Sequence, residues 1–201
     1  MERFKPDLEE VNYFVVALLV TAAAYTAYSG SFTVESSLFF TAVAGLVILT
    51  RELGQRIVAQ WMKADTEIHL SLKGSIITLI GALIAFLTQL PVIILFPVHN
   101  TYSITSYEHW GRQVDGMWSK REYHLVSGGI LALLIGWLIT YLLGYSTVAL
   151  AFALFALFQM LPFDYSKIPT DRLDGSIILR VNGFSWLIFF TAILIALALA
   201  V

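Results

Sequence analysis

The sequence contains no cysteine and few charged residues. Without cysteine, disulfides, thiolate metal ligands and cysteine nucleophiles are all excluded. Charged residues make up only 13% of the 201 residues and hydrophobic residues 58%, which is outside the usual range of soluble globular domains. The formal net charge of −2 gives no sign of nucleic-acid binding. Composition therefore predicts a polytopic membrane protein that contacts the lipid bilayer.

Long apolar runs mark the expected membrane spans. A membrane helix needs about 20 mostly apolar residues. The first residues mix both charge signs and lack the form of a cleavable signal peptide, so the first run is interpreted as a span. We expect about five spans in a single membrane domain over residues 1–201. These spans are residues 11–29, 36–62, 124–143, 147–162 and 184–201.

Residues 75–98 are apolar enough to span but are interrupted by Gly81, Pro91 and Pro97. If this segment enters the membrane and returns on the same side, all 12 Lys and Arg residues fall on one side, which the positive-inside rule makes cytoplasmic. A full crossing would move the loop at 99–123 outward and remove this asymmetry. We therefore predict a re-entrant segment packed against other helices, and a cytoplasmic N-terminus in the cytoplasmic membrane.

Polar and apolar residues alternate between the second span and the re-entrant segment. Thr66, Ile68, Leu70 and Leu72 fall on one face of this alternation. A period of two is typical of a short β-strand, here at the membrane boundary. The expected fold class is thus an all-α polytopic membrane protein with a short β element.

Residues 51–55, inside the second span, read Arg-Glu-Leu-Gly-Gln. A zinc protease helix reads His-Glu-x-x-His, in which the two histidines bind one zinc ion and the glutamate is the general base. Here Arg51 and Gln55 occupy the two ligand positions, while Glu52 remains. A guanidinium has no free lone pair and stays protonated, so Arg51 cannot be a zinc ligand.

Several further segments, in the same order along the chain, make the sequence similar to one known family. It resembles the site-2 protease family of intramembrane zinc metalloproteases, particularly its small archaeal and bacterial members. The segments are residues 51–61 (the zinc-binding helix), 66–72 (the edge strand), 125–132 (the Ala-Gly-Pro-x-x-Asn helix start), 155–162 (Asn-Leu-Leu-Pro) and 173–180 (Leu-Asp-Gly-Gly). Together they imply a site-2-protease-like fold over most of the chain.

The resemblance implies roles for the residues that remain and for those that have changed. It makes Glu52 the catalytic glutamate and Asp174 the third zinc ligand. Arg51 and Gln55 replace the two zinc-binding histidines, and the absence of these histidines is sufficient to abolish catalysis. We therefore expect a pseudoprotease with no metal and no cofactor, in which these four residues form a vestigial site.

The chain departs from the family pattern at other positions too. Gly129 and Ala132 stand where the family has Pro and Asn, Gln159 stands where it has Asn, and an insertion within 163–173 separates Pro162 from Asp174.

A buried cation needs a partner, because an ionisable group in the membrane is unfavourable by roughly several kcal/mol unless it is paired or hydrated. We expect the Arg51 guanidinium to replace the metal cation and to neutralise Asp174 or Glu52, with Gln55 nearby, since its planar fork can hold a carboxylate bidentately. The alternative is that Arg51 extends alone to the inner membrane interface.

The predicted strand suggests a binding surface. In the family such strands are thought to pair with an unfolded stretch of substrate, so Thr66, Ile68, Leu70 and Leu72 would hold an extended peptide without cutting it. Alternatively, the strand pairs only with a neighbouring segment of this chain or of a partner.

The leading functional hypothesis is a non-catalytic membrane protein. It would bind membrane-protein segments, or scaffold a membrane complex together with partner subunits. One alternative is an active intramembrane metalloprotease with unusual ligands. Another is a transporter or channel that reuses the polar intramembrane cavity, since Arg51, Glu52 and Asp174 are charges of the kind that mark transport pathways.

Overall fold

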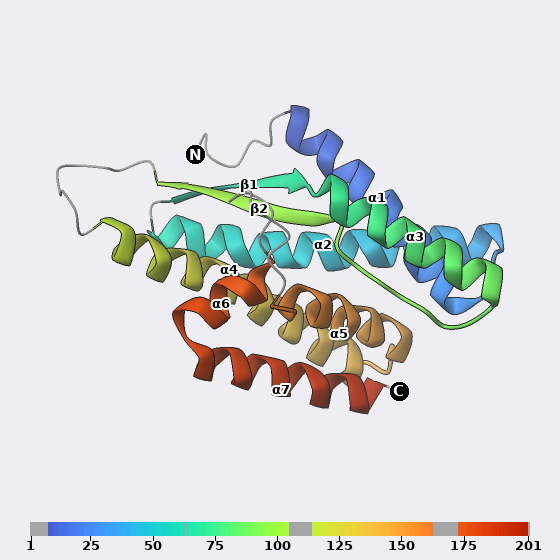
Figure 1. Cartoon of the computed structure of the whole chain (residues 1–201). Coiled ribbons are helices and arrows are strands. Elements are labelled where there is room, and N and C mark those ends of the chain that lie inside the picture. The colour runs from blue at the N-terminus through green and yellow to red at the C-terminus, as the bar shows by residue number, and fades with distance from the viewer. Residues whose placement is uncertain (1–7, 63, 105–113, 163–172, 201) are drawn as a thin grey trace. The chain divides into compact units, whose positions relative to one another are not determined.

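The computed structural model describes residues 8–62, 64–104, 114–162 and 173–200 (Figure 1). These ranges are mostly helical and contain a two-stranded sheet. In chain order the elements are α1 (Leu8–Ser29), α2 (Val34–Met62), β1 (Ala64–Leu70), α3 (Leu72–Thr88), β2 (Val98–Ile104), α4 (Val114–Leu142), α5 (Ser146–Met160), α6 (Asp174–Val181) and α7 (Gly183–Ala200). Apart from Leu173, the predicted insertion at 163–173 lies outside the described residues.

Four of the helices are long and apolar enough to cross a membrane: α1, α2, the Lys120–Leu142 part of α4, and α7. The span expected at 147–162 forms α5, an apolar helix of 15 residues, shorter than the roughly 20 that a crossing usually needs. Large apolar side chains such as Phe184, Leu187 and Ile195 are exposed along α7, as on a helix that faces lipid. These features are those of a helical membrane protein, while the cytoplasmic N-terminus stays a prediction.

Backbone contacts divide the chain into two compact units. The first contains the residues up to Leu49 together with Ile68–His99, and the second contains Thr50–Glu67 together with the residues from Asn100 onward. The first unit includes α1, α3 and the N-terminal part of α2. The second includes the C-terminal part of α2 and helices α4 to α7. The two units are described separately below.

In the first unit, the end of β1 is set by the start of α3. Ser71 is the N-cap of α3, and its hydroxyl accepts a hydrogen bond from the Gly74 backbone N–H at 3.0 Å. The strand therefore ends at Leu70, and the prediction that Leu72 belongs to it is wrong. Leu72 is the first residue of α3, and its side chain is 69% exposed.

The segment predicted to be re-entrant consists of α3 and an extended return. The helix ends at Thr88, and its C-cap residue Gln89 has a left-handed conformation with φ 56°. The returning chain then contacts the first turns of α3, where the Phe96 N–H donates to the Thr78 hydroxyl at 2.9 Å. The Ser71 N–H donates to the Pro97 carbonyl at 3.0 Å, so the two ends of the segment lie together. A re-entrant segment requires this geometry, while its depth in a membrane stays a prediction.

The region 99–123, expected to be a polar loop, contains regular structure at both ends. Residues Val98–Ile104 form β2, which pairs with β1, and α4 begins at Val114. Valine, threonine, tyrosine and isoleucine in this strand favour extended backbone. Pairing with β1 satisfies the backbone N–H and C=O groups along the edge of β2 that faces β1. The hydrogen bond from Ser71 to Pro97 places the end of β1 beside the start of β2, so the pair is antiparallel.

In the second unit, small residues allow helices to approach closely. A Cβ atom added at Gly54 of α2 would lie 2.6 Å from the backbone oxygen of Gly128 in α4 and 2.5 Å from the Ala132 side chain. A Cβ at Gly136 of α4 would lie 2.5 Å from the Phe152 ring of α5. Glycine at these positions is therefore required by close packing, as in many membrane helix pairs.

Replacing Gly54 with alanine is expected to lower the free energy of unfolding by about 1 to 3 kcal/mol, because the new methyl group meets backbone that cannot rotate away. Gly183→Ala is the matched control, since the atom nearest to its added Cβ would be a Leu179 side-chain carbon at 3.8 Å. The control should change stability by less than about 1 kcal/mol. Unfolding in detergent micelles measures both variants, and equal stabilities would contradict the close approach of α2 and α4.

Candidate functional site

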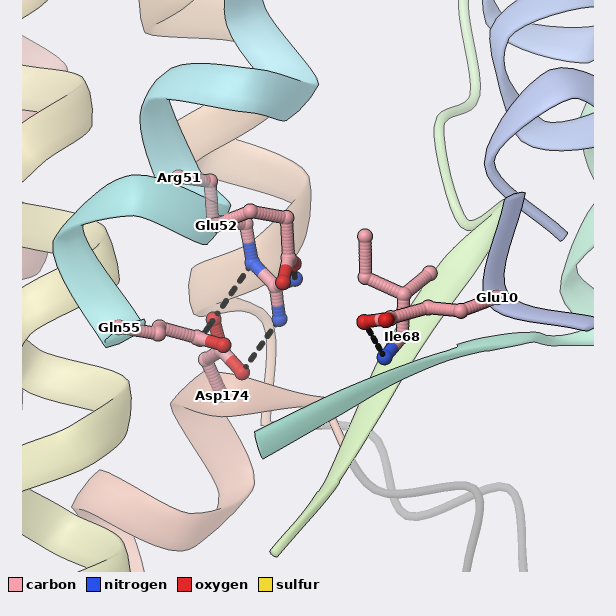
Figure 2. A network of polar contacts seen from close by, with 6 residues as sticks. All are labelled: Glu10, Arg51, Glu52, Gln55, Ile68 and Asp174. Atoms are coloured by element: carbon pink, nitrogen blue, oxygen red, sulfur yellow. Dashed lines mark hydrogen bonds and ion pairs between the residues drawn. The ribbon is translucent and has the colours of Figure 1, made fainter. Parts of the chain in front are cut away.

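The C-terminal half of α2 carries three buried polar side chains. Arg51 and Gln55 are four residues apart and share one helix face, and Glu52 follows Arg51. Each is buried, and Arg51 is 0% exposed. Figure 2 shows the side chains of Arg51 and Gln55 directed toward Asp174, the first residue of α6, and the Glu52 carboxylate beside the Arg51 guanidinium.

The Arg51 guanidinium binds two carboxylates. Its Nε donates to Asp174 Oδ2 at 3.0 Å and its Nη2 donates to Asp174 Oδ1 at 2.8 Å, which is a bidentate pair. Its Nη1 donates to Glu52 Oε1 at 2.8 Å. The structure therefore shows the pairing expected from the sequence, and Arg51 does not extend alone toward an interface.

Gln55 completes the contact with Asp174. Its Nε2 donates to Asp174 Oδ2 at 3.3 Å, while within the described ranges its Oε1 has no hydrogen-bond partner. Space for this amide comes from α4, because a Cβ at Gly129 would lie 2.8 Å from the Gln55 Cγ and Nε2 atoms. Any larger residue at position 129 would displace Gln55 from the carboxylate.

Burial and charge act in opposite directions on Asp174. Removal from water raises the pKa of Asp174, since burial disfavours the ionised carboxylate. The positive charge of Arg51 and the hydrogen bonds from Arg51 and Gln55 lower the pKa and so oppose that rise. Ionised Asp174 in this environment thus depends on Arg51.

The position of Asp174 is set by close contact between α6 and the end of α5. A Cβ at Gly175 would overlap with the backbone oxygen of Met160, so the chain at this point requires glycine. The same Met160 oxygen accepts a hydrogen bond from the indole Nε1 of Trp186 in α7 at 3.0 Å. The segments that resemble the family's Leu-Pro and Asp-Gly motifs therefore lie together.

Other residues singled out from the sequence lie outside the cluster around Arg51, on β1 and α5. Thr66, Ile68 and Leu70 lie on β1, where Ile68 is buried and the other two are half-buried. Gln159 is buried in α5, and among the described residues neither atom of its side-chain amide has a hydrogen-bond partner.

Sequence reasoning missed Glu10, whose carboxylate is buried near the start of α1 and accepts a hydrogen bond from the Ile68 backbone N–H. Its sequence signal is ambiguous, because acidic residues at a helix start usually interact only with the helix dipole.

The cluster around Arg51 is held together by ion pairs. In the part of the chain that the structure describes, no group of three or more His, Asp or Glu side chains is placed to hold a metal ion. Two of the three positions that the family resemblance assigns to zinc are a cation and an amide. As it stands, the arrangement joins α2 to α6 through ion pairs and hydrogen bonds.

Replacing Arg51 with methionine is expected to lower the free energy of unfolding by about 3 to 5 kcal/mol, because Asp174 loses its buried countercharge. Adding Asp174→Asn should recover part of this loss, since the stranded carboxylate is removed as well. Arg180→Met is the control: its 3.4 Å pair with Glu122 is half-exposed and should contribute less than about 1 kcal/mol. If Arg51→Met were no worse than Arg180→Met, the buried pair would not support the fold.

Comparison of the chain with models of protein families, with curated proteins and with solved structures found no match. Function is therefore inferred below from the chemistry of the cluster and from the motifs in the sequence.

Proposed function

We propose that this chain is a non-catalytic protein of the site-2 protease type, which binds membrane-protein segments without cutting them. The observation that carries the proposal is the bidentate pair between Arg51 and Asp174. A permanent organic cation occupies the place in which the resembling enzymes hold zinc.

The convergence of three positions supports this interpretation. Arg51 and Gln55 stand at the two histidine positions of the motif, and both donate hydrogen bonds to Asp174, which stands at the third ligand position. These residues come from α2 and α6 and are more than 100 positions apart in the sequence. Side chains at the three positions therefore meet at one point, as the ligands of a zinc site must.

The chemistry of the cluster disfavours catalysis at two points. First, a guanidinium repels a metal cation and has no lone pair to donate to it. Second, Glu52, which the resemblance makes the general base, accepts a hydrogen bond from Arg51 Nη1. One oxygen of the carboxylate that would act as the base is therefore already engaged by the guanidinium.

The part of the proposal that concerns binding depends on β1. A strand has two edges, and β2 pairs along one of them. The other edge is where an extended segment of a client protein would be added by backbone hydrogen bonding. The alternative to client binding is that the chain scaffolds a complex with fixed partner subunits. The crosslinking experiment below distinguishes these two functions.

Metal analysis tests the non-catalytic part. The purified wild-type chain, dialysed against zinc and then against buffer, is expected to retain no zinc. The double variant Arg51→His/Gln55→His is expected to retain about one zinc ion per chain, because two histidines and Asp174 then provide three ligands. Adding Asp174→Asn to the double variant is the matched control and should reduce the zinc retained. Stoichiometric zinc in the wild-type chain, with turnover of a peptide, would overturn the proposal.

Photocrosslinking in membranes tests the binding part. A photoreactive residue at Leu70 on β1 is expected to capture segments of other membrane proteins, since extended peptides add at strand edges. The same group at Leu72, which is exposed on α3, is the control and should capture fewer. Products with one fixed set of subunits in constant ratio would favour scaffolding, and products within the chain alone would count against client binding.

A further inference from the structure

One carboxylate from α1 lies against the edge of β1. Glu10 Oε1 accepts a hydrogen bond from the backbone N–H of Ile68 at 3.1 Å (Figure 2). Both residues belong to the first compact unit, and Glu10 is only 9% exposed. A buried carboxylate that binds the backbone of a strand is unusual, because carboxylates are rarely buried without a specific partner.

The alternating direction of the backbone N–H groups along β1 shows which of its two edges Glu10 contacts. Backbone N–H groups of successive residues in a strand point to opposite edges. The Ser71 N–H donates to Pro97 at the start of β2, so odd-numbered residues in this stretch direct their N–H groups toward β2. The Ile68 N–H therefore points to the opposite, outer edge, and Glu10 occupies the position of a missing neighbouring strand.

We propose that Glu10 closes the outer edge of β1, and that an extended peptide binds this edge only when the carboxylate leaves. The Glu10 oxygen stands where a backbone carbonyl of an added strand would accept the same hydrogen bond. This inference rests on the proposed function, because it takes the extended peptide to be a client segment.

A second contact from the same helix reaches a side chain on a face of the sheet. Tyr13 lies one turn beyond Glu10 on α1, and its ring centroid is 5.6 Å from that of His69 on β1. His69 in turn stacks on His99 of β2 at 5.9 Å. The first turns of α1 are thus attached to β1 both by Glu10, at the edge, and by Tyr13, at a face.

The strength of the Glu10 contact determines which peptides can compete. A single peptide carbonyl would offer the Ile68 N–H the same kind of hydrogen bond that Glu10 already accepts, so an isolated peptide bond gains nothing by displacing Glu10. An extended segment gains further hydrogen bonds with the other backbone groups on this edge, such as the N–H of Leu70. The arrangement therefore selects extended segments over isolated polar groups.

The test compares four forms of the full-length chain in lipid nanodiscs: wild type, Glu10→Ala, Glu10→Asp and Glu9→Ala. Alanine removes the acceptor, and aspartate keeps the charge but shortens the side chain. Glu9→Ala removes the same charge from an exposed neighbouring position and is the matched control. The probe is a blocked peptide of about eight alternating Thr and Val residues with a photoreactive group at its centre.

Without the probe, hydrogen exchange at the Ile68 amide should become at least about tenfold faster in Glu10→Ala and Glu10→Asp than in the wild type or in Glu9→Ala. With the probe, the two position-10 variants should crosslink at β1 several times more than the other two forms and regain protection at Ile68. The aspartate variant keeps the proposal testable if the alanine variant fails to fold.

Unchanged exchange at Ile68, or faster exchange with no gain in crosslinking to the probe, would overturn the inference. These outcomes are distinct from failure of the proposed function, which zinc and peptide turnover in the wild-type chain would show.

Discussion

The buried pair between Arg51 and Asp174 is the interaction on which the arrangement of the second unit depends. A guanidinium carries five N–H donors, and three of its nitrogens reach carboxylate oxygens at 2.8 to 3.0 Å. Removal of these charges from water offsets much of their attraction, so such a pair contributes little net stability compared with an apolar replacement. Its effect is on specificity, because only one placement of α6 against α2 leaves neither charge unpaired.

Two small residues of α4 are matched in shape to the part of α2 that carries Gln55. Gly129 and Ala132 stand where the family has Pro and Asn, and the structure places them against Gln55 and Gly54 of α2. The amide of Gln55 fits because position 129 has no side chain. The methyl group of Ala132 lies so close to Gly54 that a larger residue at either position would overlap with the other. The buried cluster therefore requires matched residues on α2 and α4 as well as the ion pair between α2 and α6.

The fold was predictable from the sequence where one physical constraint acts alone. Apolar runs of about 20 residues give the helices α1, α2, α4 and α7, since backbone in lipid must be hydrogen-bonded within its own segment. Alternation predicts β1, but its end depends on a single cap at Ser71, which places Leu72 in α3. The second strand was missed because its polar and aromatic residues are equally typical of a membrane interface.

Prediction of the site from the sequence was limited for a different reason. No periodicity connects Arg51 with Asp174 across more than 100 residues, and only the order of family-like motifs suggested that they meet. No motif in the sequence indicated a role for Glu10. Acidic residues at a helix start are common, and nothing in the sequence distinguishes Glu10, which binds the edge of a strand, from Glu9, which is exposed.

Under the proposed function, in which the chain binds a segment without cutting it, closure of the strand edge by Glu10 bears on how the segment is released. A protease that binds its substrate as an added strand releases it by cutting, because shorter products make fewer backbone hydrogen bonds. A protein that holds a segment without cutting it can release it only by dissociation, and an open edge strand binds extended chains with little discrimination. An internal acceptor such as Glu10 competes for the same N–H group, weakens every occupant by a similar amount and closes the edge after the occupant leaves. Under the proposed function, Glu10 therefore provides the release step that cleavage would supply in an active protease.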